Sequence, residues 1–171
     1  TLVNYEEPSA PDNVADFDIC HFEGLTLSNS IPVSGTGKWS QSSGPAATIL
    51  NPASAGTQVV GIIPGSTYTF RWTVSNGVCT PRYDDVTVTV YEQVTMAEAG
   101  ANQAFCNQTS AVLNGNNPLI GTGTWTVENG PNIPVFANAN SANTQVNGLV
   151  VGTYTLRWTI DNGTCSSYDE M

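Results

Sequence analysis

Four cysteines, one histidine and fourteen carboxylates are the reactive side chains of this sequence. Cys20 and Cys106 lie 86 residues apart, and Cys79 and Cys165 are separated by the same interval. This symmetry predicts two disulfides, Cys20–Cys79 and Cys106–Cys165. Each bridge would close a loop of about 60 residues and stabilise its part of the fold by roughly 4 kcal/mol. Cysteines placed in this way are typical of an oxidising, extracellular compartment.

The single imidazole limits the enzymatic chemistry that the chain could perform. A Ser-His-Asp or Cys-His arrangement would have to use His21, whose counterpart 86 residues further on is Asn107. No C-x-x-C spacing occurs, so a zinc site is not expected. Carboxylate pairs for glycoside hydrolysis are numerically available, but none stands in an apolar stretch. The sequence therefore predicts a non-enzymatic protein without catalytic or cofactor-binding residues.

Carboxylates gather where repeated segments join and beside the last strand of a repeat. Their oxygens could bind Ca²⁺, and the calcium candidates are Asp12, Asp16, Asp18, Asp84 and Asp85. They could equally keep exposed strand ends soluble and unpaired. Asp16 and Asp18 have no acidic counterpart in the second copy, which weakens the argument for a metal. Both interpretations stay open, and no other cofactor is predicted.

The charge balance excludes two classes of partner. Only four basic residues stand against fourteen acidic ones, which gives a net charge of -10. Nucleic-acid binding depends on Lys and Arg that neutralise phosphates, so this partner is not expected. An anionic lipid surface is disfavoured for the same reason, and no apolar run approaches the roughly 20 residues of a membrane span. The chain does not begin with Met, which predicts a processed product or a piece of a longer protein.

One stretch occurs twice and organises the rest of the chain. TYTFRWTVSNG at residues 67–77 returns as TYTLRWTIDNG at residues 153–163, with eight of eleven positions identical. Large apolar residues alternate with Thr and Arg, which predicts a β-strand with one buried face. Asn-Gly then predicts a tight turn into another strand. The predicted core residues are Trp39, Tyr68, Trp72, Trp125, Tyr154 and Trp158.

The four tryptophans allow a second interpretation, a platform on which sugar rings stack. Trp72 and Trp158 share a strand face with the other large apolar residues, and Trp39 and Trp125 recur in the same relation to them. This placement favours the core over a binding surface.

The 86-residue period predicts two tandem β-sandwich repeats of immunoglobulin size in an all-β chain. Residues 8–93 are expected to form the first repeat and residues 94–171 the second. Residues 1–7 (TLVNYEE) match the end of the strand DDVTVTVYEQ, as if they closed a preceding repeat. The second repeat lacks the residues that would match Thr87 to Val90, so the chain is cut in circular register.

This register suggests strand exchange. A sandwich that lacks its last strand leaves a groove, which residues 1–7 of another copy could fill. The candidate donor residues are Thr1, Leu2, Val3, Asn4 and Tyr5. Leu2 matches Val88 in phase, whereas Asn4 replaces Val90. The alternative is a window on a longer covalent array, in which flanking repeats take the place of other copies.

An immunoglobulin topology also bears on the disulfides. It would place Cys20 and Cys79 at opposite ends of a sandwich, too far apart for the Cα separation of about 6 Å that a disulfide needs. A bridge between neighbouring repeats, or free thiols, therefore stays open beside the symmetric pairing.

Several segments resemble the tandem Ig-like or PKD-like repeats of secreted cell-surface proteins of Bacteroidetes. The segments are CHFEGLTL, GTGKW, TYTFRWTVSNGVC and DDVTVTV, with the second-copy partners CNQTSAVL, GTGTW and TYTLRWTIDNGTC. Such repeats occur in gliding-motility-type adhesins and related giant surface proteins. The resemblance implies an Ig-like sandwich at the cell surface, but a shared fold does not fix function.

These observations lead to one functional hypothesis and one alternative. The hypothesis is a structural repeat unit of an extracellular fibre, such as an adhesin stalk or a pilus-like filament, whose partners are copies of itself or flanking repeats. The alternative is a carbohydrate- or protein-binding module of a secreted multidomain protein, with surface polysaccharide as a partner. Asn107 and Asn162 begin formal glycosylation sequons and predict surface loops.

Overall fold

The computed structural model describes residues 1–21 and 24–171 and confirms the all-β class. Thirteen strands occur within these described residues, and they divide into two compact units, Thr1–Glu92 and Gln93–Met171. We call them unit 1 and unit 2. No helix in the described part of the chain has the length and apolarity that crossing a membrane would require.

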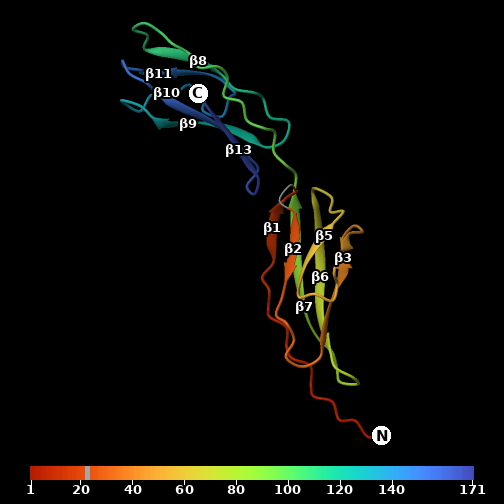
Figure 1. The fold of residues 1–171 in the computed structure, drawn as a ribbon. Coiled ribbons are helices and arrows are strands. Elements are labelled where there is room, and N and C mark those ends of the chain that lie inside the picture. Colours follow the sequence, from red (N-terminus) through yellow and green to blue (C-terminus); the bar gives the residue numbers. More distant parts are fainter. Residues whose placement is uncertain (22–23) are drawn as a thin grey trace. The chain divides into compact units, whose positions relative to one another are not determined.

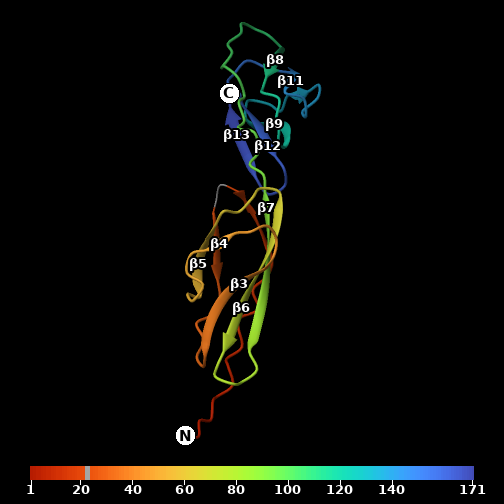
Figure 2. The ribbon, with the colours of Figure 1, turned by 90° about the vertical axis from the view of Figure 1, so that its right-hand side faces the viewer.

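Unit 1 is a sandwich of two sheets (Figures 1 and 2). The four-stranded sheet has the order β1-β7-β6-β3, with β1 (Phe17–Cys20), β3 (Thr36–Ser43), β6 (Ser66–Ser75) and β7 (Arg82–Tyr91). The three-stranded sheet has the order β2-β5-β4, with β2 (Leu25–Ser28), β4 (Thr48–Ile49) and β5 (Gly56–Val60). β1 runs parallel to β7, whereas the other pairs are antiparallel.

Unit 2 repeats this plan with one strand fewer. One sheet has the order β13-β12-β9, with β9 (Thr122–Asn129), β12 (Thr155–Asp161) and β13 (Ser166–Glu170). The other has the order β10-β11-β8, with β8 (Ser110–Asn114), β10 (Val135–Phe136) and β11 (Asn143–Asn147). The described residues of unit 2 contain no counterpart of β1.

Alternation along β6 and β7 builds the core of unit 1. Tyr68, Phe70, Trp72 and Val74 are each no more than 1% exposed, as the period-two pattern predicts. From β7, Val86, Val88 and Val90 face the same interior. The Tyr68 hydroxyl accepts a hydrogen bond from the Ile63 backbone N–H at 2.7 Å, the tyrosine-corner arrangement of Ig-like sandwiches.

Unit 2 has the same centre around a tilted pair of tryptophans. The Trp125 and Trp158 rings lie 5.2 Å apart, as do the rings of Trp39 and Trp72 in unit 1. Tyr154 is only half-buried, although the sequence placed it in the core beside its counterpart Tyr68. Its hydroxyl accepts a hydrogen bond from the Val150 N–H and donates one to the Asn132 side-chain oxygen.

Residues 1–7, which the sequence predicted as a strand, form no strand in unit 1. They extend from the end of unit 1 at which β6 turns into β7 (Figure 1). The Asn76 amide donates to the Glu6 carbonyl at 3.0 Å, and Arg82 forms an ion pair with Glu7 at 2.9 Å. The Tyr5 ring covers Gly77 so closely that an added Cβ would lie 2.4 Å from it. This segment is therefore anchored at Tyr5–Glu7, whereas Leu2 is 96% exposed.

The symmetric disulfide pairing is wrong. Cys20 and Cys165 are disulfide-bonded, whereas Cys79 and Cys106 are free thiols. Cys20 stands opposite Tyr91, at the end of β7, and Cys79 precedes the first residue of that strand. A ten-residue strand spans roughly 30 Å, so these two cysteines lie at opposite ends of one sheet. The symmetry of the repeat gives the spacing of the cysteines along the chain, but it does not show how far apart they lie in the fold.

Candidate strand-accepting groove

Unit 2 has an open groove of about 690 Å³ between its two sheets. Its apolar floor comes from both sheets, and we define the strand groove by Leu113, Val146, Leu156, Tyr154 and Phe105. Polar side chains border it on the side of residues 102–108, among them Asn102, Gln103, Asn107 and Gln108. Glu170 and Met171 also line it.

Unit 1 carries a strand segment at the corresponding place. Val88 and Val90 of β7 are fully buried there, and Ile19 of β1, paired with Val90, is only 8% exposed. Phe105 lies 86 residues beyond Ile19 and is 54% exposed. The strand groove is thus the part of the Ig-like core that the second half of β7 and its neighbour β1 cover in unit 1.

Strand pairing in unit 2 stops where the groove begins. The Leu156 N–H donates to the Met171 carbonyl at 3.0 Å, and the Met171 N–H donates back at 2.9 Å. This pair corresponds to Phe70 and Val86 of unit 1, beyond which β6 and β7 continue to pair up to Ser66 and Val90. Within the described residues no strand pairs with residues 152–154, so β12 starts only at Thr155. This edge can accept a further segment of strand.

In each unit an arginine binds an acidic residue of the last strand. Arg71 binds Asp85 through two hydrogen bonds of 2.8 and 2.7 Å and stacks on Tyr83. These hydrogen bonds lower the pKa of Asp85 and raise that of Arg71. In unit 2, Arg157 binds Glu170, which raises the pKa of Arg157, and covers the Tyr168 ring. Glu170, which precedes the open part of the groove, is therefore held in place by Arg157.

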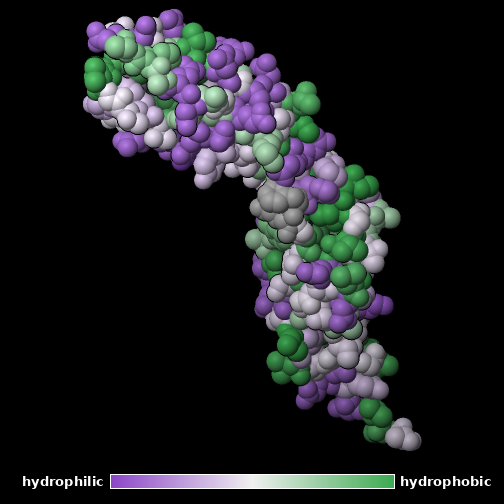
Figure 3. Space-filling model, turned by 45° about the horizontal axis from the view of Figure 1, so that its top comes forward, coloured by the Kyte–Doolittle hydropathy of each residue, from purple (hydrophilic) through white to green (hydrophobic). Residues whose placement is uncertain are grey.

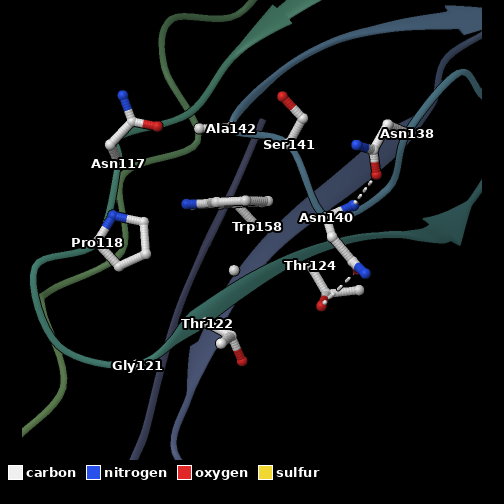
Figure 4. Close-up of a pocket in the computed structure, with 11 residues that line it drawn as sticks. Asn117, Pro118, Gly121, Thr122, Thr124, Asn138, Asn140, Ser141, Ala142 and Trp158 are labelled. Atoms are coloured by element: carbon white, nitrogen blue, oxygen red, sulfur yellow. Dashed lines mark hydrogen bonds between the residues drawn. The ribbon is translucent and has the colours of Figure 1, made fainter.

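A second cavity, of about 640 Å³, lies beside β9 (Figure 4). Figure 4 shows its polar wall, in which the Asn138 side chain accepts a hydrogen bond from the Asn140 N–H at 3.0 Å. Thr124 donates to the Asn140 side chain at 3.3 Å. Trp158 lies at the centre of the view but is fully buried. We call this cavity the polar cleft, and no charged side chain lines it.

Three of the five acidic residues that the sequence proposed as calcium ligands, Asp16, Asp84 and Asp85, have carboxylates with structural partners. Asp84 accepts a hydrogen bond from the Val14 N–H at 3.0 Å, and Asp16 accepts one from the Thr87 N–H at 2.7 Å. Asp85 is bound to Arg71, and the Asp12 N–H donates to Asn29. Among residues 1–21 and 24–171, no group of three or more His, Cys, Asp or Glu is placed to hold a metal ion. Calcium binding stays a prediction.

The tryptophans do not form a platform for sugars. Trp39, Trp72, Trp125 and Trp158 are at most 2% exposed, and all four belong to the two cores. His21 follows β1 directly and is half-buried. Asn107 is exposed with a φ of 53°, whereas Asn162 accepts a hydrogen bond from the Cys165 N–H at 2.9 Å in a turn. Whether either asparagine is glycosylated stays a prediction.

The sequence identified the missing strand but not the residues that line its place. Phe105 and residues 149–152 were not among the candidate residues, although Phe105 repeats the spacing of Ile19. That 86-residue relation is the signal that could have found it. The polar cleft left no signal, because isolated Asn and Thr residues in loops are common in any β-sandwich.

No protein-family model matches the chain, and no curated protein matches its sequence. Solved Ig-domain structures are similar to it. The N-terminal eight Ig domains of Down Syndrome Cell Adhesion Molecule isoform 1.30.30 match with a TM-score of 0.50 and 12% identity, over 98% of this chain and 27% of that one. Murine CEACAM1b matches with a TM-score of 0.49 and 12% identity, over 90% and 92%. Sidekick-1 immunoglobulin domains 1–4 match with a TM-score of 0.49 and 10% identity, over 99% and 49%.

The chain spans about a quarter of the first of these structures and about half of the third. At this level of identity the likeness concerns the fold alone. It confirms the Ig-like β-sandwich that the sequence predicted.

Proposed function

We propose that this chain is a non-enzymatic structural unit of an extracellular fibre, in which the strand groove of one copy takes up residues 1–7 of the next. The observation that carries the proposal is the groove itself, which stands where unit 1 holds the second half of β7. A strand added there completes the sheet through main-chain hydrogen bonds and fills the core with alternate side chains.

The register of the donor follows from the repeat. Met171 occupies the place of Val86, so the next inward positions are those of Val88 and Val90. TLVNYEE aligned with TVTVYEQ puts Leu2 at the first of these and Asn4 at the second. Val3 takes the outward place of Thr89. Asn4 enters the groove beside its polar border of amide side chains, which suits an amide better than a wholly apolar pocket would.

The donor segment is accessible where the proposal needs it. Leu2 and Val3 are 96% and 58% exposed, and apolar surface lies at the N-terminal end of unit 1 (Figure 3). Tyr5 and Glu6 are held against unit 1 by contacts with Gly77 and Asn76. Residues 1–4 can therefore fill the open part of a neighbouring groove, while Tyr5 to Glu7 lie at its edge and keep their contacts with their own unit 1.

The connection between strand and unit has the same length in both cases. Val94, the first buried residue of unit 2, follows Tyr91 by three residues, and Pro8, buried in unit 1, follows Tyr5 by three. The Ser9 N–H donates to the Ser34 carbonyl at 3.0 Å, and the Thr95 N–H donates to the Ile120 carbonyl at the same distance. A copy joined by its residues 1–7 would thus be connected as unit 2 is to β7. Because the contact is head to tail, it continues into a linear array.

An extracellular setting is consistent with the chemistry of the chain. Cys20 and Cys165 are disulfide-bonded, a state that persists in oxidising compartments. The likeness to the Ig domains of a cell adhesion molecule supports a surface role of the same broad kind, either as an adhesin stalk or as a filament. The net charge of -10 keeps such an array soluble and argues against nucleic acid as a partner.

Two matched substitutions in the donor test the proposal. Leu2→Asp places a charge at the inward position, whereas Val3→Asp changes the outward neighbour and serves as the control. We expect Leu2→Asp to weaken self-association roughly tenfold to a hundredfold, because the buried Leu side chain contributes about 1.5–3 kcal/mol. Val3→Asp should assemble nearly as the wild type does. Sedimentation velocity across a concentration series measures both, and electron microscopy shows whether the particles are linear.

Equal assembly of the two variants would overturn the strand register.

A peptide with the sequence VTVTVYE, added to the protein, distinguishes a second copy from a flanking repeat as the source of the strand. If it protects the amides of residues 152–155 from exchange while the unmodified chain stays monomeric, a flanking repeat of a longer array fills the groove, and the second copy is excluded. A scrambled peptide of the same composition is the control.

The alternative function is a carbohydrate- or protein-binding module of a secreted multidomain protein, and its carbohydrate-binding form is not favoured. It required exposed tryptophans, and the structure buries all four. The polar cleft offers hydroxyl and amide groups but no accessible aromatic face for a sugar ring to stack upon.

A further inference from the structure

The four cysteines belong to two structural classes. Cys20 and Cys106 stand near the start of each repeat, and Cys79 and Cys165 follow the Asn-Gly turn near its end, each pair 86 residues apart. One cysteine of each class is disulfide-bonded, namely Cys20 and Cys165. The two free thiols, Cys106 and Cys79, again comprise one of each class. The chain therefore offers one thiol of the first class on unit 2 and one of the second class on unit 1.

Cys106 stands between two residues that line the strand groove, Phe105 and Asn107, and its side chain is exposed. Its counterpart Cys20 is the last residue of β1 and pairs in register with Tyr91 of β7. In a groove filled by residues 1–7, the residue at the place of Tyr91 is Tyr5 of the donor. Cys106 should then lie opposite Tyr5, at the spacing of about 4.8 Å between neighbouring strands.

Cys79 is already next to the same donor residue. Its sulfur lies 3.8 Å from the Tyr5 carbonyl oxygen and 3.3 Å from the Glu6 carbonyl oxygen of its own chain. In unit 1 the Val90 carbonyl accepts from Gly65, on the β6 side, so the next carbonyl along β7 faces the β1 side. The Tyr5 carbonyl, at the place of Tyr91, therefore points toward the edge at which Cys106 lies. Both thiols meet at one donor residue.

We propose that Cys106 of one copy and Cys79 of the copy that donates its residues 1–7 form an intermolecular disulfide that locks the fibre. This inference rests on the proposed strand insertion and adds a covalent bond to it. Because both thiols lie at the same edge of Tyr5, we expect their Cα atoms to come within the separation of about 4.4–6.8 Å that a disulfide requires.

The bond forms by thiol–disulfide exchange with a small disulfide such as oxidised glutathione. One protein thiolate attacks a glutathione sulfur and releases one reduced glutathione, leaving a mixed disulfide. The second protein thiolate then attacks the protein sulfur of that mixed disulfide and releases the second glutathione. Two thiols are oxidised, one glutathione disulfide is reduced, and two protons leave the protein thiols.

The experiment uses the full chain and two single variants, Cys79→Ser and Cys106→Ser. Self-association is first measured by sedimentation, and oxidised glutathione is then added. The wild type should give a ladder of species spaced by 18.0 kDa on non-reducing electrophoresis. Each variant alone should stay monomeric on the gel, and a mixture of the two should give dimers and nothing larger. Mass spectrometry of the digested dimer should contain a Cys79–Cys106 cross-link.

Several outcomes would overturn the inference. Dimers of equal yield from either variant alone would indicate a symmetric bond, and so would a Cys79–Cys79 or Cys106–Cys106 peptide. If Leu2→Asp gives the same ladder as the wild type, the disulfide does not depend on strand insertion. Reversible assembly without the cross-link would overturn the disulfide and leave the proposed function intact. Absence of both assembly and cross-link would overturn both.

Discussion

Unit 1 and unit 2 are built from the same repeat, but they differ in how their cores are covered. In unit 1, Ile19 of β1 and the valines of β7 cover Tyr68, which is fully buried. In unit 2, β13 ends at Glu170, Phe105 is 54% exposed, and Tyr154 is half-buried. The central Trp pairs are nevertheless alike, at 5.2 Å in both units. An Ig-like centre therefore forms without the last half-strand, which seals only one end of the core.

The largest effect should come from the matched pair Ile19 and Phe105. We expect Ile19→Ala to destabilise unit 1 by about 2–5 kcal/mol, because it leaves a cavity under β7. Phe105→Ala should change unit 2 by no more than about 0.5 kcal/mol in the unfilled groove, because its side chain is mostly in water. Hydrogen exchange of the amides of each unit, measured as the temperature is raised, gives the change in stability for both variants. A larger loss for Phe105→Ala would mean that the strand groove is already covered in solution.

The next pair compares the two central indoles. Trp158 donates its ring N–H to the Asn116 backbone and side-chain oxygens at 3.2 Å, whereas the ring N–H of Trp72 has no partner in the described chain. Replacement by Phe leaves a similar cavity in both units. We therefore expect Trp158→Phe to cost about 1 kcal/mol more than Trp72→Phe. Chemical denaturation of the two variants gives the difference, and equal losses would remove this distinction between the cores.

A smaller difference should appear at the two tyrosine corners. Tyr68→Phe removes the acceptor of the Ile63 N–H, and we expect a loss of about 1 kcal/mol. Tyr154→Phe should cost less than Tyr68→Phe, because Tyr154 is only half-buried, so that water can replace its hydroxyl, whereas Tyr68 is fully buried. Exchange rates of the Ile63 and Val150 amides report the two bonds separately. Addition of the VTVTVYE peptide should bring the two variants closer together.

The smallest effect concerns Asp85, whose pKa is lowered by its hydrogen bonds to Arg71. A carboxylate with a lowered folded-state pKa stabilises the fold above its unfolded-state pKa, and this contribution is lost as the pH falls through the folded-state value. Asp85→Asn should therefore lower the melting temperature slightly at neutral pH. The melting temperatures of the wild type and of Asp85→Asn should converge in acid, at a pH below the ordinary Asp pKa of about 3.9. A difference that is constant with pH would exclude the charge as its cause.

Much of this fold could be predicted because the repeat displays its own pattern. Alternation along TYTFRWTVSNG and VTVTV identified β6 and β7 together with their buried faces. β1 could not be predicted in the same way, since FDIC is short and each of its residues pairs in parallel with a residue of Val88–Tyr91 that lies 71 positions further along the chain. Spacing alone gave the cysteines a false pairing, because it contains no information on the end of the sheet at which each one lies.

The sequence predicted that a strand is missing at the strand groove, but it did not predict which residues line the groove. Comparison of the repeats showed that the residues matching 87–90 do not occur in unit 2. Tyr154 is only half-buried because no strand covers it at that gap. Strand periodicity had predicted Tyr154 as a core residue. Periodicity reports which face of a strand is apolar. It does not report whether a neighbouring strand is present to cover that face.

The parallel pairing of β1 with β7 has a mechanical consequence for unit 1. Tension on unit 1 would pull β1 through the chain that precedes it and β7 through the chain that follows it. Because the two strands lie side by side and parallel, the opposing forces act along them and load all four register pairs, Phe17–Val88 to Cys20–Tyr91, in shear at the same time. Antiparallel strands pulled from one shared end would instead open one hydrogen bond after another, so unit 1 is arranged to resist stretching as a whole.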